Sequence, residues 1–448
     1  MRYLPKGPAE RQEMLEAIGA HNIEELFHSI PDEFRLREPL HLPGPLSEAG
    51  IIEYFRARAA ENARGYTSFL GAGVYQHFRS VVTDALIQRG EFLTSYTPYQ
   101  AEIAQGTLQS IFEFQTLMCQ LTGQEVANAS MYDGSTALTE AVLMAERLTS
   151  RRNVLVARTL HPEYRQVLAT YAKHCDLNVT EVGFTSSGQL DTSTLSPESL
   201  AHAAAVVVQS PNYFGVVEDI PALAPIAHAH GALLVTCITE AVSLGIVRPP
   251  AEADIVAMEA QSFGVAPSFG GPFVGVIASR DKFVRQMPGR LVGQASDAEG
   301  RRGYVLTLAT REQHIRREKA TSNICTNEAL FALAATIHLC LMGKEGLREM
   351  AQQNLSKAHF ALAELTKIPG VRHCFSGPVF NEFALEFPRS VKIINHALLR
   401  EKIIGPLPLG VNYPEQTKCG LVAVTETMPR AEIERFAAAI RQILARPV

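Results

Sequence analysis

Short apolar runs alternate with helical patterns through the middle of the chain. The apolar runs lie at 154–157, 178–182, 205–209 and 232–236, and segments with helical spacing separate them. Strands that are buried on both faces and alternate with helices form parallel sheets. The pattern therefore predicts an α/β domain with a mostly parallel sheet, in which ligands bind at the carboxyl ends of the strands.

Different patterns flank this region. Residues 1–75 are expected to form a helical arm, broken by the Pro-rich stretch 35–45. The arm has too little apolar surface for a core of its own, so it is expected to wrap the main body or a partner chain. Residues 76–320 then form the large α/β domain, and 321–448 form a small α+β domain joined to it through an apolar helix at 327–342.

Composition excludes several classes of protein. The 448 residues are 46% hydrophobic and 19% charged, and the net charge of −5 argues against a nucleic-acid binder. No apolar run approaches the roughly 20 residues of a membrane span, and the first residues lack the apolar core of an export signal. The seven cysteines are scattered without a CxxC pair, which favours reduced thiols, no metal site and a cytoplasmic location.

The stretch 254–272 lacks a residue that its pattern leads one to expect. It follows the last of the apolar strand patterns and ends in a Gly-Gly-Pro turn before another apolar run, 273–278. In pyridoxal-phosphate enzymes with a parallel sheet, a loop of this shape carries the Schiff-base lysine. Here no lysine occurs between Lys173 and Lys282.

A polar, aromatic-rich loop at 92–106 precedes a long helical pattern at 107–121. Its functional side chains are Ser95, Tyr96, Tyr99, Gln100, Glu102 and Gln105. Such a density of polar and aromatic groups favours a site or an interface, and a capping loop is the alternative.

The start of the next helical pattern carries small hydroxyl residues. These positions are Asp133, Gly134, Ser135 and Thr136. A helix N-terminus of this kind can bind an anion, but ordinary N-capping by Asp133 or Ser135 explains the spacing at least as well.

Two glycines at 71 and 73 suggest a dinucleotide-binding loop only superficially. The third glycine of the fingerprint is replaced by Gln76, and no strand pattern precedes the loop. An NAD-binding oxidoreductase is therefore disfavoured.

A charged segment at 310–323 admits two interpretations. Its basic residues are Arg311, Arg316, Arg317 and Lys319. Mixed charges at helical spacing usually form a solvated face with ion pairs, and the alternative is a recognition surface for an acidic partner.

Several stretches resemble the glycine cleavage system P-protein family, most closely the subunit 1 type of its split bacterial form. The matching stretches are 96–106, 127–134, 248–250, 261–272, 287–290 and Thr310-Arg-Glu-Gln-His-Ile-Arg-Arg-Glu-Lys-Ala-Thr-Ser-Asn-Ile-Cys-Thr-Asn327. They are spread over nearly the whole chain, and the last is long enough to be highly specific.

The resemblance implies an aspartate-aminotransferase-like fold and a second subunit that carries the lysine and the cofactor. Comparison with lysine-bearing relatives places Gln261 at the lysine position and Cys237 at the position of the Asp that pairs with the pyridine nitrogen. A neutral thiol cannot hold that nitrogen protonated. This chain would then have no catalytic residue of its own and no covalently bound pyridoxal phosphate. The family expectation is a heterodimer with subunit 2, paired into a heterotetramer.

The implied activity is that of glycine dehydrogenase (decarboxylating), an oxidoreductase of glycine catabolism. Glycine loses CO2 on the partner's cofactor, and the aminomethyl group passes to the lipoyl arm of the H-protein. The loop at 95–105 would complete the partner's active site, residues 133–136 would be a vestigial phosphate site, and the basic residues of 311–319 would receive the partner or the carrier. A self-sufficient pyridoxal-phosphate aminotransferase or lyase, and a purely structural or regulatory subunit, are the alternatives.

Overall fold

The computed structural model describes residues 7–446, which form two compact units divided between Arg64 and Gly65. The first unit contains the helices α1 (Pro8–Ile18) and α2 (Glu48–Ala60), with the 3-10 turns η1 (Ile23–Phe27) and η2 (Asp32–Phe34) between them. Among its described residues only Leu15 is buried. The unit therefore has almost no core of its own, as its sparse apolar pattern predicts.

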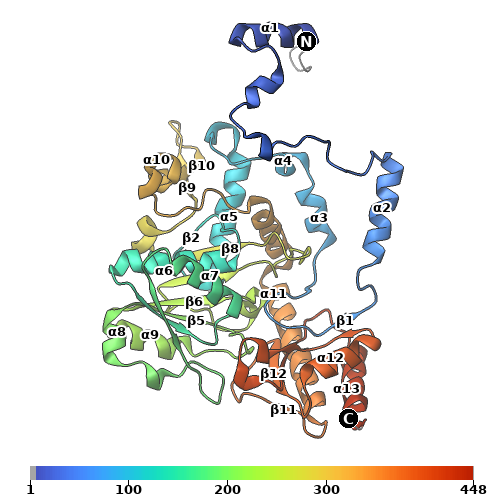
Figure 1. The fold of residues 1–448 in the computed structure, drawn as a ribbon. Helices are drawn as coiled ribbons and strands as arrows, with labels where there is room; N and C mark the ends of the chain where they lie inside the picture. The colour runs from blue at the N-terminus through green and yellow to red at the C-terminus, as the bar shows by residue number, and fades with distance from the viewer. Residues whose placement is uncertain (1–6, 447–448) are drawn as a thin grey trace. The chain divides into compact units, whose positions relative to one another are not determined.

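The second unit is built on a seven-stranded mixed sheet with the order β2-β8-β7-β6-β5-β3-β4 (Figure 1). Strands β3 to β7 run parallel, whereas β8 and the edge strand β2 are antiparallel to their neighbours. The bounds are β2 Val126–Ala127, β3 Asn153–Ala157, β4 Asn178–Val182, β5 Ala203–Gln209, β6 Leu233–Ile238, β7 Ile255–Glu259 and β8 Gly275–Ser279. The predicted α/β fold with a mostly parallel sheet is confirmed.

Helices cover both faces of this sheet. The helices α5 (Gln105–Thr122), α9 (Ile220–His228) and α11 (Ala329–Thr366) contribute to the apolar core on one face. On the other face, α6 (Gly134–Thr149) and α7 (Pro162–Ala172) do so. Alternate residues of one strand serve the two cores, because successive side chains of a strand point to opposite faces.

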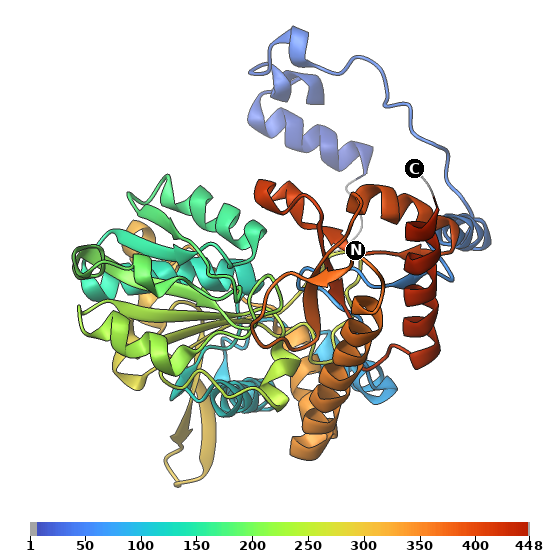
Figure 2. The ribbon, with the colours of Figure 1, turned by 90° about the horizontal axis from the view of Figure 1, so that it is seen from below.

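A small domain follows, with the four-stranded antiparallel sheet β11-β12-β15-β14 (Figure 2). Its elements are β11 Arg372–His373, β12 Glu382–Glu386, β14 Leu407–Pro408, β15 Cys419–Ala423, α12 Val391–Arg400 and α13 Arg430–Ala445. The chain enters the second unit through this domain, because β1 (Thr67–Ser68) pairs with β13 (Ile403–Ile404) and Phe69 stacks on Phe436 at 4.1 Å. Residues 65–75, expected at the end of the arm, lie in this compact unit.

The long helix α11 connects the two domains. Gly343, with φ 59° and ψ −173°, interrupts it one residue after the predicted apolar helix at 327–342. Among residues 7–446 it is the one helix that could cross a membrane by length and composition. The part of α11 before Gly343 is shorter than the roughly 20 residues that a span requires. Its residues Ala332, Ala335 and Leu339 are buried in the core on one face of the sheet.

Shorter elements complete the second unit. They are α3 Val81–Ile87, α4 Gly90–Leu93, α8 Pro197–His202, the hairpin β9 Leu291–Ser296 and β10 Arg302–Thr307, and α10 Gln313–Arg316. The hairpin packs against α5 and lies next to the loop that precedes α5.

Candidate functional site

The lysine-free loop after β7 is stabilised by hydrogen bonds that Gln261 makes within the loop. Gln261 lies directly after β7 and is buried. Its side-chain Nε2 donates to the carbonyl of Val265 at 2.5 Å, and its backbone N–H donates to the Glu259 carboxylate at 2.9 Å. The amide therefore supports the local turn, and it offers no amine for a covalent cofactor.

The buried carboxylate of Glu259 joins three segments. It accepts the backbone N–H groups of Gly134, Gln261 and Val274 at 2.8, 2.9 and 2.9 Å. Burial raises the pKa of Glu259 to about 7, and these backbone N–H groups oppose the rise. The one side chain thus fixes both ends of the lysine-free loop and the first residue of α6.

The N-terminus of α6 is capped from within the chain. The Asp133 carboxylate accepts the backbone N–H of Thr136 at 2.7 Å and the hydroxyl of Ser135 at 2.7 Å. A Cβ atom at Gly134 would collide with the Tyr164 hydroxyl. A phosphate here would meet the carboxylates of Asp133 and Glu259 instead of free N–H groups, so the residues 133–136 do not fit this group.

Cys237 lies in the middle of this buried region. Its side chain belongs to the core between β6 and α6, and burial, together with the nearby Glu259, raises the pKa of its thiol. Burial also raises the pKa of the Tyr164 hydroxyl well above its usual value. Both groups are therefore neutral near pH 7, and neither supplies the negative charge that would hold a pyridine nitrogen protonated.

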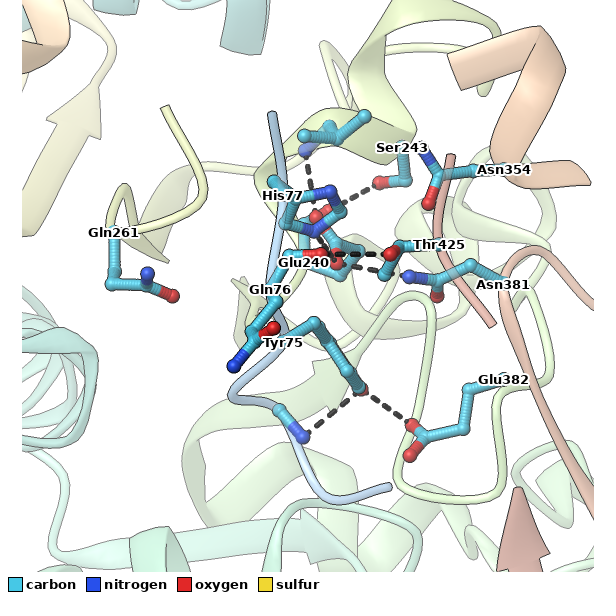
Figure 3. A network of polar contacts seen from close by, with 12 residues as sticks. Tyr75, Gln76, His77, Glu240, Ser243, Gln261, Asn354, Asn381, Glu382 and Thr425 are labelled. Atoms are coloured by element: carbon cyan, nitrogen blue, oxygen red, sulfur yellow. Dashed lines mark hydrogen bonds and ion pairs between the residues drawn. The ribbon is translucent and has the colours of Figure 1, made fainter. Parts of the chain in front are cut away.

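A strap of residues 71–78 crosses between the two domains, and Figure 3 shows its polar network. A Cβ atom at Gly71 would collide with Glu382, and Gly73, at φ 84°, passes over His161. His161 is a neutral buried ring, since Nδ1 accepts the Glu163 N–H at 3.2 Å and Nε2 lies 3.1 Å from the carbonyl oxygen of Ala72. The two glycines thus allow a close crossing and belong to no nucleotide loop.

His77 is the centre of the strap. Its Nε2 lies 2.9 Å from Glu240 of the large domain, and its Nδ1 lies 2.8 Å from Glu426 of the small domain. Burial alone would lower the pKa of His77, but Glu240 and then Glu426 outweigh it and raise the value to about 10. Burial opposes ionisation of Glu426, yet the contact with His77 lowers its pKa. The imidazolium is therefore charged and shared by two carboxylates.

Further contacts tie the strap to the small domain. The Glu382 carboxylate accepts the Tyr75 hydroxyl at 2.7 Å and the Ala72 N–H at 2.6 Å, and burial raises its pKa to about 8. The Thr425 hydroxyl donates to the carbonyl of Gln76 at 2.7 Å. Figure 3 shows Gln261 apart from this network. Sequence reasoning missed the strap, because its partners lie up to 351 positions away along the chain.

Arg290 organises the loop before α5. This side chain, in a residue only 5% exposed, donates to Thr97 Oγ1 at 3.0 Å, to Tyr99 Oη at 3.2 Å and to the Cys325 carbonyl at 3.0 Å. A cavity of about 240 Å³ opens beside it, lined in part by Ser95, Tyr96 and Arg290. The buried guanidinium of Arg290 therefore connects the loop before α5 to the segment around Cys325.

The predicted residues of this loop divide into two kinds. Tyr96 is 82% exposed, and Gln100 and Glu102 are also exposed. Gln105 instead serves the fold, because its side chain donates to the carbonyl of Tyr304 at 2.8 Å and accepts the Tyr304 N–H at 2.9 Å.

The basic residues after β10 also divide. Arg311 points inward and donates to the carbonyls of Leu308 at 3.1 Å and Gly289 at 3.1 Å, and burial lowers its pKa. Arg316, Arg317 and Lys319 are exposed, and within residues 7–446 none of the three forms an ion pair. The helix there, α10, has only four residues, and the segment's ion pairs join Glu312 to Arg290 and to His314.

The architecture is that of the fold-type I pyridoxal-phosphate enzymes. The structure of a sphingosine-1-phosphate lyase from Burkholderia pseudomallei superposes with a TM-score of 0.68 at 18% identity, covering 92% of this chain and 93% of that one. At this identity the likeness shows a shared fold.

The chain belongs to the glycine cleavage system P-protein family, whose profile matches residues 1–440. The "Probable glycine dehydrogenase (decarboxylating) subunit 1" of Solibacter usitatus is 56% identical over 441 residues, which are 98% of this chain and 97% of the relative. The crystal structure of a glycine decarboxylase (P-protein) of the glycine cleavage system, in inhibitor-bound form, matches with a TM-score of 0.89 at 43% identity, covering 99% of this chain and 100% of that one. The relatives' designation as subunit 1 implies a partner subunit.

Proposed function

We propose that this chain is the lysine-free subunit of a two-subunit glycine decarboxylase. The cofactor is held covalently by subunit 2, the two form a heterodimer, and heterodimers pair into a heterotetramer. The observation that carries the proposal is Glu259, whose carboxylate occupies the α6 N-terminus where fold relatives would hold a phosphate. Gln261 and Cys237 remove the covalent anchor and the ring partner of the same group.

The partner's pyridoxal phosphate supplies the electron sink that lets glycine lose CO2. This chain contributes surfaces around that site. We infer that the exposed hydroxyl of Tyr96 and the carboxylate of Glu102 orient the substrate. Arg290 supports the same loop through its hydrogen bonds to Thr97 and Tyr99. A preorganised loop loses little conformational entropy on assembly, which favours a precise geometry across an interface.

Exposed apolar side chains before and within the loop at 92–106 are consistent with contact to a partner chain there. The large apolar residues exposed between 70 and 103 are Leu70, Val74, Phe78, Val81, Val82, Leu86, Leu93, Tyr96, Tyr99 and Ile103. A concentration of this kind along the strap, α3, α4 and the following loop is typical of a subunit interface.

The aminomethyl group passes from the partner's cofactor to the lipoyl arm of the H-protein. The unpaired Arg316, Arg317 and Lys319 form the surface that receives this carrier, since free exposed cations accelerate the approach of an acidic protein. We also propose a cytoplasmic location, which the seven free cysteines support.

Substitution of Tyr96 by Phe tests the contribution across the interface. In the complex reconstituted with subunit 2, Tyr96→Phe should lower kcat for glycine decarboxylation by roughly tenfold or more, because one hydrogen bond to a charged group is worth about 1.5–3 kcal/mol. Tyr66→Phe removes a comparable hydroxyl outside the loop and should leave kcat unchanged.

Unchanged kinetics of Tyr96→Phe in an intact complex would favour a second candidate, a purely structural or regulatory subunit. The exposed apolar surface is compatible with that candidate, whereas the exposed polar groups beside the Arg290 cavity favour the first.

A further inference from the structure

A cavity of about 440 Å³ lies on the face of the large sheet that α9 covers, and Thr236 and Ile238 of β6 line it. Because successive side chains of a strand point to opposite faces, these two residues lie on the face away from Cys237. Ile238 accordingly belongs to the core with α9 and α11, whereas Cys237 belongs to the core with α6. The cavity is therefore separate from the buried region around Cys237, and its volume lies in the range of roughly 300–1,000 Å³ that small-molecule sites occupy.

The walls of this cavity are apolar and rigid. Proline fixes its own backbone φ angle, and the walls contain Pro221, Pro249, Pro250 and Pro378. The backbone N–H of Val217 donates to the carbonyl of Pro378 at 2.8 Å, which joins the wall of the large domain to the small domain. Pro249 and Pro250 belong to the stretch 248–250, which the proposed function does not use. Such a preformed cavity loses little conformational entropy when a ligand binds.

The buried polar groups along the wall already have partners. The Glu218 carboxylate accepts the Leu190 N–H at 3.0 Å and the Asn212 side-chain amide at 2.8 Å. The Ser210 hydroxyl accepts the Glu218 N–H at 3.1 Å, and the Ser243 hydroxyl donates to a backbone carbonyl at 2.7 Å. These groups therefore support the wall and leave little capacity for a ligand.

Thr236 is the exception. Its residue is fully buried, and its hydroxyl has no hydrogen-bond partner among residues 7–446. Burying an unpaired hydroxyl is unfavourable, and valine has nearly the same shape without that cost. A threonine in the cavity lining thus points to a ligand group that bonds with its hydroxyl.

The charges around the cavity limit the class of ligand. The carboxylates of Glu218 and Asp219 line one side and disfavour an anion. The guanidinium of Arg248 pairs with Glu252, so it is not a free cation for a ligand carboxylate. The apolar side chains of Ile220 and Val247 disfavour a strongly hydrated cation.

We propose that this cavity binds an uncharged small molecule with a branched apolar body and one amide, carbonyl or hydroxyl group, which bonds with Thr236. The site belongs to this chain alone, so the proposal goes beyond the proposed function and does not depend on a partner subunit.

Saturation-transfer NMR on the full chain, with 3-methylbutanamide as the probe, tests the site. The amide should bind with Kd of roughly 1 mM or below, as its size allows. The charged analogues of similar shape, 3-methylbutanoate and 3-methylbutylamine, should bind at least about tenfold more weakly.

Thr236→Val should raise Kd for the amide roughly tenfold, because it removes the one unsatisfied hydroxyl of the lining. The matched control is Thr83→Val on α3, which removes another fully buried hydroxyl without a partner among residues 7–446, but outside the cavity. It should leave Kd unchanged. Both variants should melt at the wild-type temperature or above, because each loses an unpaired polar group.

Val247→Phe is a second variant, which fills the cavity from its partly exposed rim and should abolish binding. Undetectable binding of the amide to wild type, or equal Kd values for Thr236→Val and Thr83→Val, would refute the site. Tighter binding of the carboxylate or the amine than of the amide would overturn the proposed class of ligand. The probe is measured on the chain alone, so each of these outcomes leaves the proposed function standing.

Discussion

Replacing His77 by Gln should destabilise the chain more than most single substitutions. The variant removes the imidazolium between Glu240 and Glu426, which lie 2.9 and 2.8 Å from its two nitrogens. A glutamine amide can donate to one carboxylate, and the other is left buried without its counter-charge. Breaking a buried ion pair in this way costs about 3–5 kcal/mol of unfolding free energy.

The dependence on pH gives this prediction its sharpest form. The pKa of His77 is about 10 in the folded state and 6.5 in the reference state. A group whose folded pKa is raised stabilises the fold fully below its unfolded pKa, and this contribution is lost as the pH rises through the folded value. At about 1.4 kcal/mol per pKa unit, the difference corresponds to about 5 kcal/mol as an upper bound.

Urea unfolding followed by circular dichroism, at pH 7 and above pH 10, provides the assay. The difference in unfolding free energy between wild type and His77→Gln should be several kcal/mol at pH 7 and should shrink markedly above pH 10. Thr425→Val removes a neutral hydrogen bond to the same strap, so it should cost about 1 kcal/mol at either pH. A His77→Gln difference that stays constant with pH, or that never exceeds about 1 kcal/mol at pH 7, would refute the shared charge.

Two further predictions concern the site. Gln261→Lys should not restore covalent binding of pyridoxal phosphate, because Cys237 and Glu259 remain; an absorbance band that borohydride fixes onto residue 261 would contradict this. The double variant Arg316→Glu/Arg317→Glu should raise the apparent KM for the lipoylated carrier several-fold, and the increase should be larger at low salt. The control Lys392→Glu on α12 should leave KM unchanged. Equal KM values for the double variant and the control would exclude this surface as the carrier's docking site.

The parts of the fold that follow from local pattern could be predicted from the sequence. The strand β5 is buried along its whole length and is almost entirely apolar in sequence, so its place in a covered parallel sheet follows directly. The strand β7 was not predicted, because its residues open the stretch 254–272 that the pattern treats as a loop. The absence of a lysine is a fact of the sequence, and the family resemblance gives it meaning. Both lines of reasoning lead to the observed architecture and to the family.

Side-chain roles that depend on distant partners could not be predicted. Gln105 and Arg311 have the composition of a binding site, but their donors satisfy backbone carbonyls that only the folded chain brings near. His77 and Glu259 carry no sequence signal, because a buried charge is recognisable only once its partners are known.

The strap has a consequence for motion. Its buried partners belong to both domains, so a rotation of the small domain relative to the large one must separate His77 from Glu240 or Glu426. If that separation costs about 3–5 kcal/mol, the form with the two domains rotated apart has a population of roughly 1% or less. The two domains of this subunit are therefore expected to keep one relative orientation, and motions that admit substrate are expected outside the contact that the strap makes with both domains.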